Sequence, residues 1–211
     1  MIKLIVITVG SYFVGSIPFS IIISQLFKKI DIREYGSKNP GATNVFRVLG
    51  PGPGVLVLLL DVGKGFIVVW LSKKVFAGSI DIEPIYIQLL SGVAVTLGHI
   101  FSIFASFKGG KGIAVVGGAL LALIPHIVLL SLVVFGIILA LTRYVSLGSL
   151  SAAIFINLSL IFEKYFLKQN RPFILILTCL ALTLLVFYTH RGNIKRLLNR
   201  TEHKIGQKVK L

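Results

Sequence analysis

Residues 113–142 read IAVVGGALLALIPHIVLLSLVVFGIILALT, a stretch of thirty residues without Lys, Arg, Asp or Glu. A helix that crosses a bilayer needs about 17–25 mostly apolar residues. The stretch is longer than one upright helix and short for two, and Pro125-His126 marks the point at which two helices would meet. The number of crossings made here decides on which side of the membrane the C-terminal tail lies.

The composition of the whole chain is that of an integral membrane protein. Hydrophobic residues make up 55% of the 211 residues, charged residues make up 14%, and the mean hydropathy is +0.94. No linker, low-complexity tract or repeat divides the chain, so we expect a single polytopic membrane domain over residues 1–211. Residues 1–27 lack an A-x-A-like cleavage site, and we expect them to form the first span rather than a signal peptide.

The charges of the loops favour two crossings in residues 113–142. The other apolar runs of spanning length are 2–27, 54–72, 85–105, 148–163 and 172–190. With two crossings, the loops at 28–50, 106–112 and 143–147 and the tail at 190–211 share one side, which then carries fifteen Lys and Arg against six on the other side. The positive-inside rule then predicts an all-α protein with seven transmembrane helices, the N-terminus outside and the C-terminus in the cytoplasm. The weakness is length: residues 113–124 make only about 18 Å of helix, so this span must start within the preceding loop or cross a thinned bilayer.

The net charge of +15 has a simple explanation in most of the chain. Basic residues at span ends bind anionic lipid head groups, and this explanation suits the tail residues Arg196, Arg200, Lys204, Lys208 and Lys210. A nucleic-acid partner is not expected, because the basic residues form no binding motif and have no interleaved aromatic residues.

Two short polar loops interrupt the apolar chain and suggest a different use of charge. The first polar loop, residues 36–44, reads GSKNPGATN and is followed by Arg47; the second polar loop, residues 108–112, reads KGGKG. Glycines let consecutive backbone N–H groups turn toward an anion, hydroxyl and amide groups add neutral donors, and Lys or Arg adds countercharge. The two loops therefore predict that the protein handles phosphorylated molecules at the membrane surface.

Several common phosphate and acyl chemistries are absent from the sequence. Lys111 is followed by Gly112 rather than Ser or Thr, so the second polar loop is not a P-loop. There is no G-x-S-x-G nucleophile motif and no H-x-x-x-x-D pair, and the four histidines and the single Cys179 are too dispersed to predict a metal site. We expect no cofactor and no metal.

The polar motifs, taken together, resemble those of the bacterial membrane glycerol-3-phosphate acyltransferases that use acyl phosphate as the donor. The resemblance covers nearly the whole chain. It rests on the first polar loop with Arg47, on Gly98-His99 with the second polar loop, and on three further segments: Leu60–Gly65, Arg143–Ser149 and His190–Leu197. The chain departs from the family pattern at Ser102, Val115, Thr189 and Arg200.

The resemblance implies a reaction and its partners. A long-chain acyl group would pass from acyl phosphate to the 1-hydroxyl of glycerol 3-phosphate, without an acyl-enzyme, giving 1-acylglycerol 3-phosphate (lysophosphatidic acid) and phosphate in phospholipid synthesis. It also implies an active site that faces the cytoplasm at the inner membrane, contact with membrane lipids, and brief contact with the soluble enzyme that makes acyl phosphate.

The same resemblance implies roles for individual residues. The expected catalytic residues are Ser37, Lys111, His190 and Asn193. The expected substrate-binding residues are Gly36, Asn39, Gly41, Thr43, Asn44, Arg47, Lys108, Gly109, Gly110, Ser146 and Ser149. The proton acceptor is left open between His190 and a substrate phosphate.

Two more questions stay open at the level of sequence. Asp61 and Lys64, three residues apart, form either a structural ion pair within a span or a pair whose lysine reaches toward the phosphates. A transporter or channel for a phosphorylated metabolite is the competing class of function, since cationic loops can also line an anion path.

Overall fold

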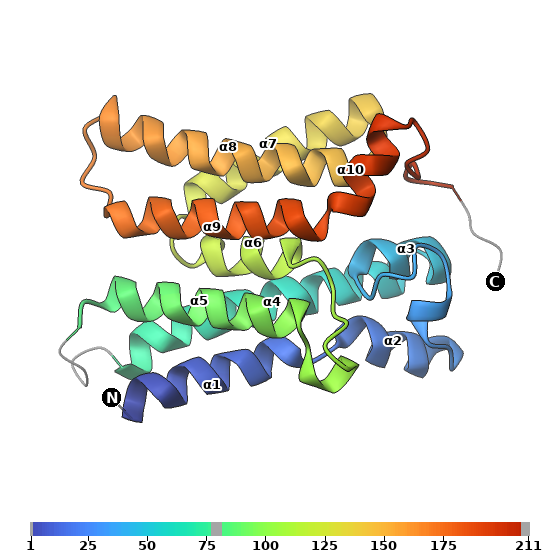
Figure 1. Ribbon diagram of the computed structural model, residues 1–211, viewed down its shortest axis with the longest axis horizontal. Coiled ribbons are helices and arrows are strands. Elements are labelled where there is room, and N and C mark those ends of the chain that lie inside the picture. The colour runs from blue at the N-terminus through green and yellow to red at the C-terminus, as the bar shows by residue number, and fades with distance from the viewer. Residues whose placement is uncertain (1, 77–81, 208–211) are drawn as a thin grey trace. The chain divides into compact units, whose positions relative to one another are not determined.

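The structure is a computed structural model, and it describes residues 2–76 and 82–207 (Figure 1). Within those ranges every regular element is helical. The tail residues Lys208 and Lys210 lie outside the described residues. The chain divides into two compact units, Met1–Leu123 with Gly206–Leu211 and Ile124–Ile205. This division does not decide whether the chain is one membrane domain, which stays a prediction.

The first unit holds six α-helices and two short 3₁₀ helices. The α-helices are α1 (Ile2–Ser16), α2 (Phe19–Lys28), α3 (Ala42–Leu49), α4 (Pro51–Phe76), α5 (Pro84–Ile100) and α6 (Ile113–Leu121), and the 3₁₀ helices are η1 (Ile32–Glu34) and η2 (Ile103–Ala105). α1 packs on α5, and α4 packs on both α5 and α6. The first polar loop joins η1 to α3, and the second joins η2 to α6.

Glycines set the close packing of these helices. A Cβ on Gly65 of α4 would lie 2.2 Å from the carbonyl oxygen of Val115 in α6, and one on Gly118 of α6 would lie 2.0 Å from that of Val62 in α4. The α1–α5 contact uses Gly15 and Gly98 in the same way. Small residues at such contacts let helix backbones approach closely in a membrane, where the hydrophobic effect does not drive helices together.

The second unit holds α7 (Pro125–Thr142), α8 (Val145–Tyr165), α9 (Phe173–Thr189) and α10 (Arg191–Leu198) (Figure 1). α8 packs on α7 and α9, and the short α10 contacts α8 and α9. Large apolar side chains on α7 remain exposed, among them Leu129, Leu130 and Val133. Such a continuous apolar surface suits contact with lipid.

The predicted break in residues 113–142 is confirmed, because α6 ends at Leu121 and α7 begins at Pro125. However, α6 has nine residues, about 13 Å of helix, and is shorter than a membrane span. Among the described residues, five stretches are long and apolar enough to cross a membrane: Ile2–Lys28, Pro51–Val75, Pro84–Ala105, Pro125–Thr142 and Val145–Tyr165. The pair α9 and α10, bent by 62°, would make a sixth. The structure is therefore all-helical with several apolar helices of spanning length, and the seven-span count and its orientation stay predictions.

Candidate functional site

Asn44 organises the first polar loop from within. This side chain is buried, its Oδ1 accepts from the backbone N–H of Ser37 at 2.8 Å, and its Nδ2 donates to the carbonyl oxygens of Ile32 and Tyr35 at 3.2 and 3.0 Å. Both amide donors are directed to the loop backbone. The sequence predicted that Asn44 donates to substrate. In the structure its side-chain amide is hydrogen-bonded to the backbone of the loop and stabilises the loop conformation.

Local backbone geometry explains why glycine stands at positions 36 and 41 of this loop. Gly36 has a φ of +60°, and a Cβ on it would lie 2.3 Å from Oδ1 of Asn44, so the turn over the Asn44 amide needs glycine. Gly41 is the N-cap of α3 in extended conformation and has no side chain to cap it. The first N–H groups of a helix have no partner within the helix, so the start of α3 offers donors beside the exposed hydroxyls of Ser37 and Thr43.

The second polar loop differs from expectation. The backbone N–H groups of Gly109 and Gly110 donate to the carbonyl oxygens of Ile100 and His99, at 3.0 and 3.1 Å, and so close the end of α5. These two N–H groups are therefore bonded within the protein, and the substrate-binding role expected for Gly109 and Gly110 stays a prediction. The two glycines serve close packing instead, because a Cβ on Gly109 would collide with the carbonyl of His99 and one on Gly110 with its Nε2. Lys108 and Lys111 remain the groups of this loop that bring positive charge.

The two polar loops meet within the first unit. A small pocket, with about 220 Å³ of empty volume including its open mouth, is lined by Pro40 of the first loop and by Gly109 and Gly110 of the second. The remaining wall comes from the break between α1 and α2, from the end of α5 and from η2. Loops far apart in sequence thus share one pocket.

A buried charged group lies beside this pocket. Nζ of Lys64 is 2.9 Å from Oδ1 of Asp61, donates to the carbonyl oxygen of Ile17 at 2.9 Å, and lies 3.0 Å from Nδ1 of His99. Lys64 and Asp61 are both buried. These contacts favour the structural role of the pair, because the lysine head group is held by Asp61, Ile17 and His99.

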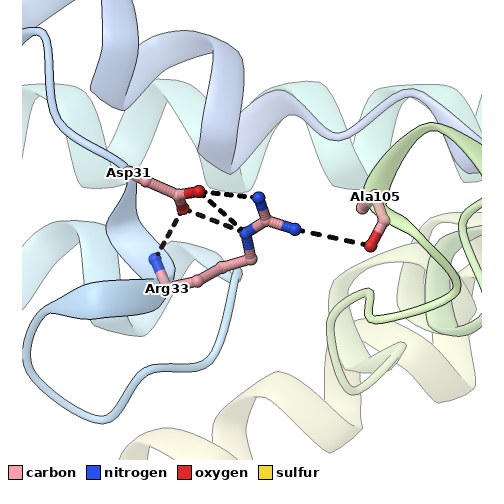
Figure 2. A network of polar contacts seen from close by, with 3 residues as sticks. All are labelled: Asp31, Arg33 and Ala105. Carbon is pink, nitrogen blue, oxygen red and sulfur yellow. Dashed lines mark hydrogen bonds and ion pairs between the residues drawn. The ribbon is translucent and has the colours of Figure 1, made fainter.

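An ion pair near the loops ties η1 to η2. Figure 2 shows Arg33 gripping the Asp31 carboxylate through Nε and Nη2, at 2.6–3.0 Å, while its Nη1 donates to the carbonyl oxygen of Ala105 at 3.4 Å. The hydrogen bonds from the Arg33 side chain lower the pKa of Asp31 against the opposing effect of burial, and the same bonds raise the pKa of Arg33. Arg33 therefore links the segment before the first polar loop to the segment before the second.

The second unit gathers a different set around Glu202. Oε1 of Glu202 accepts from Nδ2 of Asn193 at 2.7 Å and from the hydroxyl of Ser146 at 3.2 Å, and Oε2 accepts from Nε of Arg196 at 2.7 Å. Glu202, Asn193 and Ser146 are buried. The tail after α10 thereby folds back onto the first turn of α8.

His190 and Ser149 lie in the same unit. His190 is buried at the junction of α9 and α10, and its Nδ1 lies 2.9 Å from the carbonyl oxygen of Val186. A carbonyl only accepts, so Nδ1 carries a proton and donates to the Val186 oxygen. Ser149 is buried one turn after Ser146 on α8.

The predicted site residues thus fall into two groups. The first unit holds Gly36, Ser37, Asn39, Gly41, Thr43, Asn44, Arg47, Lys108, Gly109, Gly110 and Lys111; the second unit holds Ser146, Ser149, His190 and Asn193. Sequence reasoning missed Glu202. Its signal was present, since Glu202 is the one carboxylate among the seven cationic residues of the tail from residue 190.

Proteins of one family resemble this chain over nearly its whole length. The family model described as glycerol-3-phosphate acyltransferase matches residues 5–200. Relatives named glycerol-3-phosphate acyltransferase include one from Chlorobaculum tepidum, 38% identical over 98% of this chain and 98% of the relative, and one from Bacillus velezensis, 43% identical over 92% and 94%. The crystal structure of PlsY (YgiH), an integral membrane glycerol 3-phosphate acyltransferase in its glycerol 3-phosphate form, superposes with a TM-score of 0.86 at 38% identity and covers 97% of this chain and 96% of that one. A second crystal structure of PlsY, in a lysophosphatidic acid form, gives a TM-score of 0.83. The chain therefore belongs to the glycerol-3-phosphate acyltransferase family and is an integral membrane acyltransferase.

Proposed function

We propose that this enzyme transfers a long-chain acyl group from acyl phosphate to the 1-hydroxyl of glycerol 3-phosphate, releasing 1-acylglycerol 3-phosphate and inorganic phosphate. The observation that carries the proposal is the meeting of two polar loops at one pocket, where Pro40 faces Gly109 and Gly110. Both substrates carry phosphate, and cationic residues belong to or follow each loop: Arg47 for the first, Lys108 and Lys111 for the second. Of the expected site residues, Gly109 and Gly110 are the ones that line the pocket itself. The solved PlsY structures, in glycerol 3-phosphate and lysophosphatidic acid forms, support the acceptor and the product.

The chemistry needs no covalent intermediate on the protein. An acyl phosphate is a mixed anhydride whose phosphate is already a good leaving group, so the enzyme has to align two reactants and stabilise the developing oxyanion. Arg47, Lys108 and Lys111 would neutralise phosphate charge, and the hydroxyls of Ser37 and Thr43 would donate to phosphate or carbonyl oxygens. Gly36 and Asn44 would act through the shape of the first polar loop.

In the second unit, the residues for which we propose roles are Asn193 and His190. Asn193 is oriented by Glu202, which also receives the Ser146 hydroxyl. We assign proton uptake to a substrate phosphate and a positioning role to His190, because the reactive donor needs little help from a base. In that case His190→Gln keeps most of the rate and its dependence on pH. A loss of about 10²–10⁴-fold with loss of the acidic limb of the rate profile would instead make His190 the base.

The membrane arrangement that suits this function has seven crossings, with the N-terminus outside and both polar loops at the cytoplasmic face of the inner membrane. The loop charges support it, since fifteen cationic residues then lie on the inner side. A soluble enzyme that makes acyl phosphate could deliver its product at that face, so we also propose brief contact with it.

The decisive experiment measures phosphate release by the purified protein in detergent. Release from a long-chain acyl phosphate should require glycerol 3-phosphate, and lysophosphatidic acid should form in equal amount. The same assay with acyl-coenzyme A or acyl-carrier-protein thioesters should give no product, because no described feature is assigned to those carriers. Comparable turnover with a thioester, or an acyl group trapped on a serine, would overturn the proposed donor or the direct transfer.

A further inference from the structure

We propose that His99 is a further substrate-contacting residue, a neutral imidazole whose Nε2–H donates to a phosphate oxygen in the pocket where the two polar loops meet. The inference rests on the proposed function, in that it takes the ligand to be one of the two phosphorylated substrates. Three features of the first unit carry it: the contacts of Nδ1, the surroundings of Nε2, and a second unpartnered donor in the same pocket.

The contacts of Nδ1 fix the position of the imidazole proton. Lys64 is ion-paired with Asp61 at 2.9 Å and is therefore an ammonium group, which donates and cannot accept. It lies 3.0 Å from Nδ1 of His99, so Nδ1 must be the acceptor and the proton of the neutral ring sits on Nε2. Oδ1 of Asp61 is 3.6 Å from Nδ1, too far to compete for that position. Asp61 and Lys64 thus act as positioning residues for the ring.

Nε2 faces the pocket. His99 lines it and has only 8% of its surface exposed, yet among the described residues no hydrogen bond to Nε2 is formed. A Cβ on Gly110 would stand 2.3 Å from Nε2, so the glycine of the second polar loop leaves this nitrogen open on the side of the pocket. An Nε2–H that borders the pocket can donate to an oxygen of a ligand placed there.

A second donor without a hydrogen-bond partner lies in the same wall. The hydroxyl oxygen of Ser16, at the break between α1 and α2, is fully buried and has no hydrogen-bond partner among the described residues. Ser16 lines the pocket together with His99. Two donors from different helices that both lack partners and border one pocket point to an acceptor placed between them.

The size of the pocket limits that acceptor. Its empty volume of about 220 Å³ includes the open mouth, so the enclosed part admits only a small group at the end of a ligand. It suits one phosphate group rather than a complete substrate. The phosphate can belong to acyl phosphate or to glycerol 3-phosphate, and the experiment below separates the two sources.

The first test reads the ring directly by nitrogen NMR of protein labelled at its four histidines. His99→Asn assigns the His99 signals by their disappearance. We expect the Nε2–H tautomer in the resting protein, a mixture of tautomers in the double variant Asp61→Asn, Lys64→Met, and a shift of Nε2 when a phosphorylated ligand binds. The probes are glycerol 3-phosphate, dodecyl phosphate and inorganic phosphate. A response to glycerol 3-phosphate alone assigns the acceptor's phosphate, and a response to dodecyl phosphate alone assigns the donor's; no response to any of them overturns the proposal.

The second test compares two substitutions, one that retains an acceptor near the position of Nδ1 and one that retains a donor near the position of Nε2. His99→Asn can still accept from Lys64 but loses the pocket donor, whereas His99→Gln can place an amide N–H near the position of Nε2. We expect His99→Asn to lower kcat/KM about 10- to 150-fold, the range for a hydrogen bond to a charged group, and His99→Gln to recover part of the loss. His126→Asn, outside the first unit, is the matched control and should keep the wild-type rate.

The outcomes separate this inference from the proposed function. Normal turnover in the wild type with an unchanged rate in His99→Asn would mean that the pocket holds a structural water only. Absence of acyl-phosphate turnover in the wild type, together with a shift of Nε2 on phosphate binding, would overturn the proposed donor and leave the subsite standing. If the His99 variants do not fold, the nitrogen NMR of the wild-type protein tests the proposal by itself, through the tautomer of His99 and the response of Nε2 to the three ligands.

Discussion

At the residue scale, the polar side chains divide into those that build the loops and those that remain for binding. Asn44 uses Oδ1 and Nδ2 on the loop backbone, and Gly109 and Gly110 use their N–H groups on the end of α5. By contrast, Ser37 and Lys108 are exposed. Charge and hydroxyl groups therefore carry the expected recognition, and the glycines and Asn44 supply its shape.

The cationic residues should matter more than the serine. Lys111→Ala and Arg47→Ala should each lower kcat/KM about 10- to 150-fold, because each removes a charge-assisted contact of about 1.5–3 kcal/mol. Ser37→Ala should cost less, since it removes a neutral hydrogen bond. Steady-state kinetics with acyl phosphate measure all three, and a fully active Lys111 variant would reject the assigned role.

Gly110 should not tolerate a methyl group. In Gly110→Ala the new Cβ would lie 2.3 Å from Nε2 of His99 and 3.0 Å from the carbonyl oxygen of Pro40, and both neighbours belong to the pocket wall. We expect a loss of about 1–3 kcal/mol in stability, typical of overpacking, and at least a tenfold loss of rate. Gly117→Ala in α6 is the matched control, because a Cβ there has no neighbour within 4 Å. Equal melting temperatures and rates for the two variants would contradict the packing argument.

At the scale of elements, Glu202 joins the tail to α8 and α10. Glu202→Gln replaces one carboxylate oxygen by an amide N–H₂, which then faces either the two donors at Oε1 or the one donor at Oε2, so the free energy of unfolding should fall by about 1–3 kcal/mol. The rate should fall as well, since Asn193 loses its orienting partner. Thermal melting in detergent and kinetics check this, with the exposed Glu34→Gln as control. A Glu202 variant that matches the control in both measurements would show that the cluster does not orient Asn193.

The stabilisation from the Asp31–Arg33 ion pair, which links η1 to η2, should decrease at acidic pH. The pKa of Asp31 is lowered by Arg33, so the pair stabilises the fold at pH values above the ordinary carboxyl pKa of about 4, and this stabilisation is lost as the pH falls through the lower folded value. Both side chains are about a third exposed, so the effect at pH 7 should stay below about 1 kcal/mol. Asp31→Asn should melt earlier than wild type at pH 7, and the two should melt together once the pH is below the lowered pKa of Asp31. A difference in melting temperature between the variant and the wild type that grows as the pH falls would contradict this prediction.

At the scale of the whole molecule, the seven-span arrangement can be tested by labelling. Single cysteines in place of Lys38, Lys108 and Lys204 should react with an impermeant thiol reagent only from the cytoplasmic side, and one in place of Lys168 only from outside, because the loop charges set this orientation. Ser79, another expected outside position, lies outside the described residues. The native Cys179 is buried and should add little background. Labelling of the Lys204 position from outside would mean that α6 and α7 do not make two crossings.

The sequence by itself determined the membrane class, the break before Pro125, the two polar loops and the family, because hydropathy, proline and short motifs act locally along the chain. Only the tertiary structure decided where those groups act. Pro40 meets Gly110 across long stretches of sequence, Glu202 reaches back to Ser146, and the N–H of Gly109 closes α5 instead of facing an anion. The physical reason is that the direction of a donor depends on which acceptors the packing brings near it, and a motif alone does not name those acceptors. The tautomer of His99 is the clearest case, since it follows from a lysine on another helix.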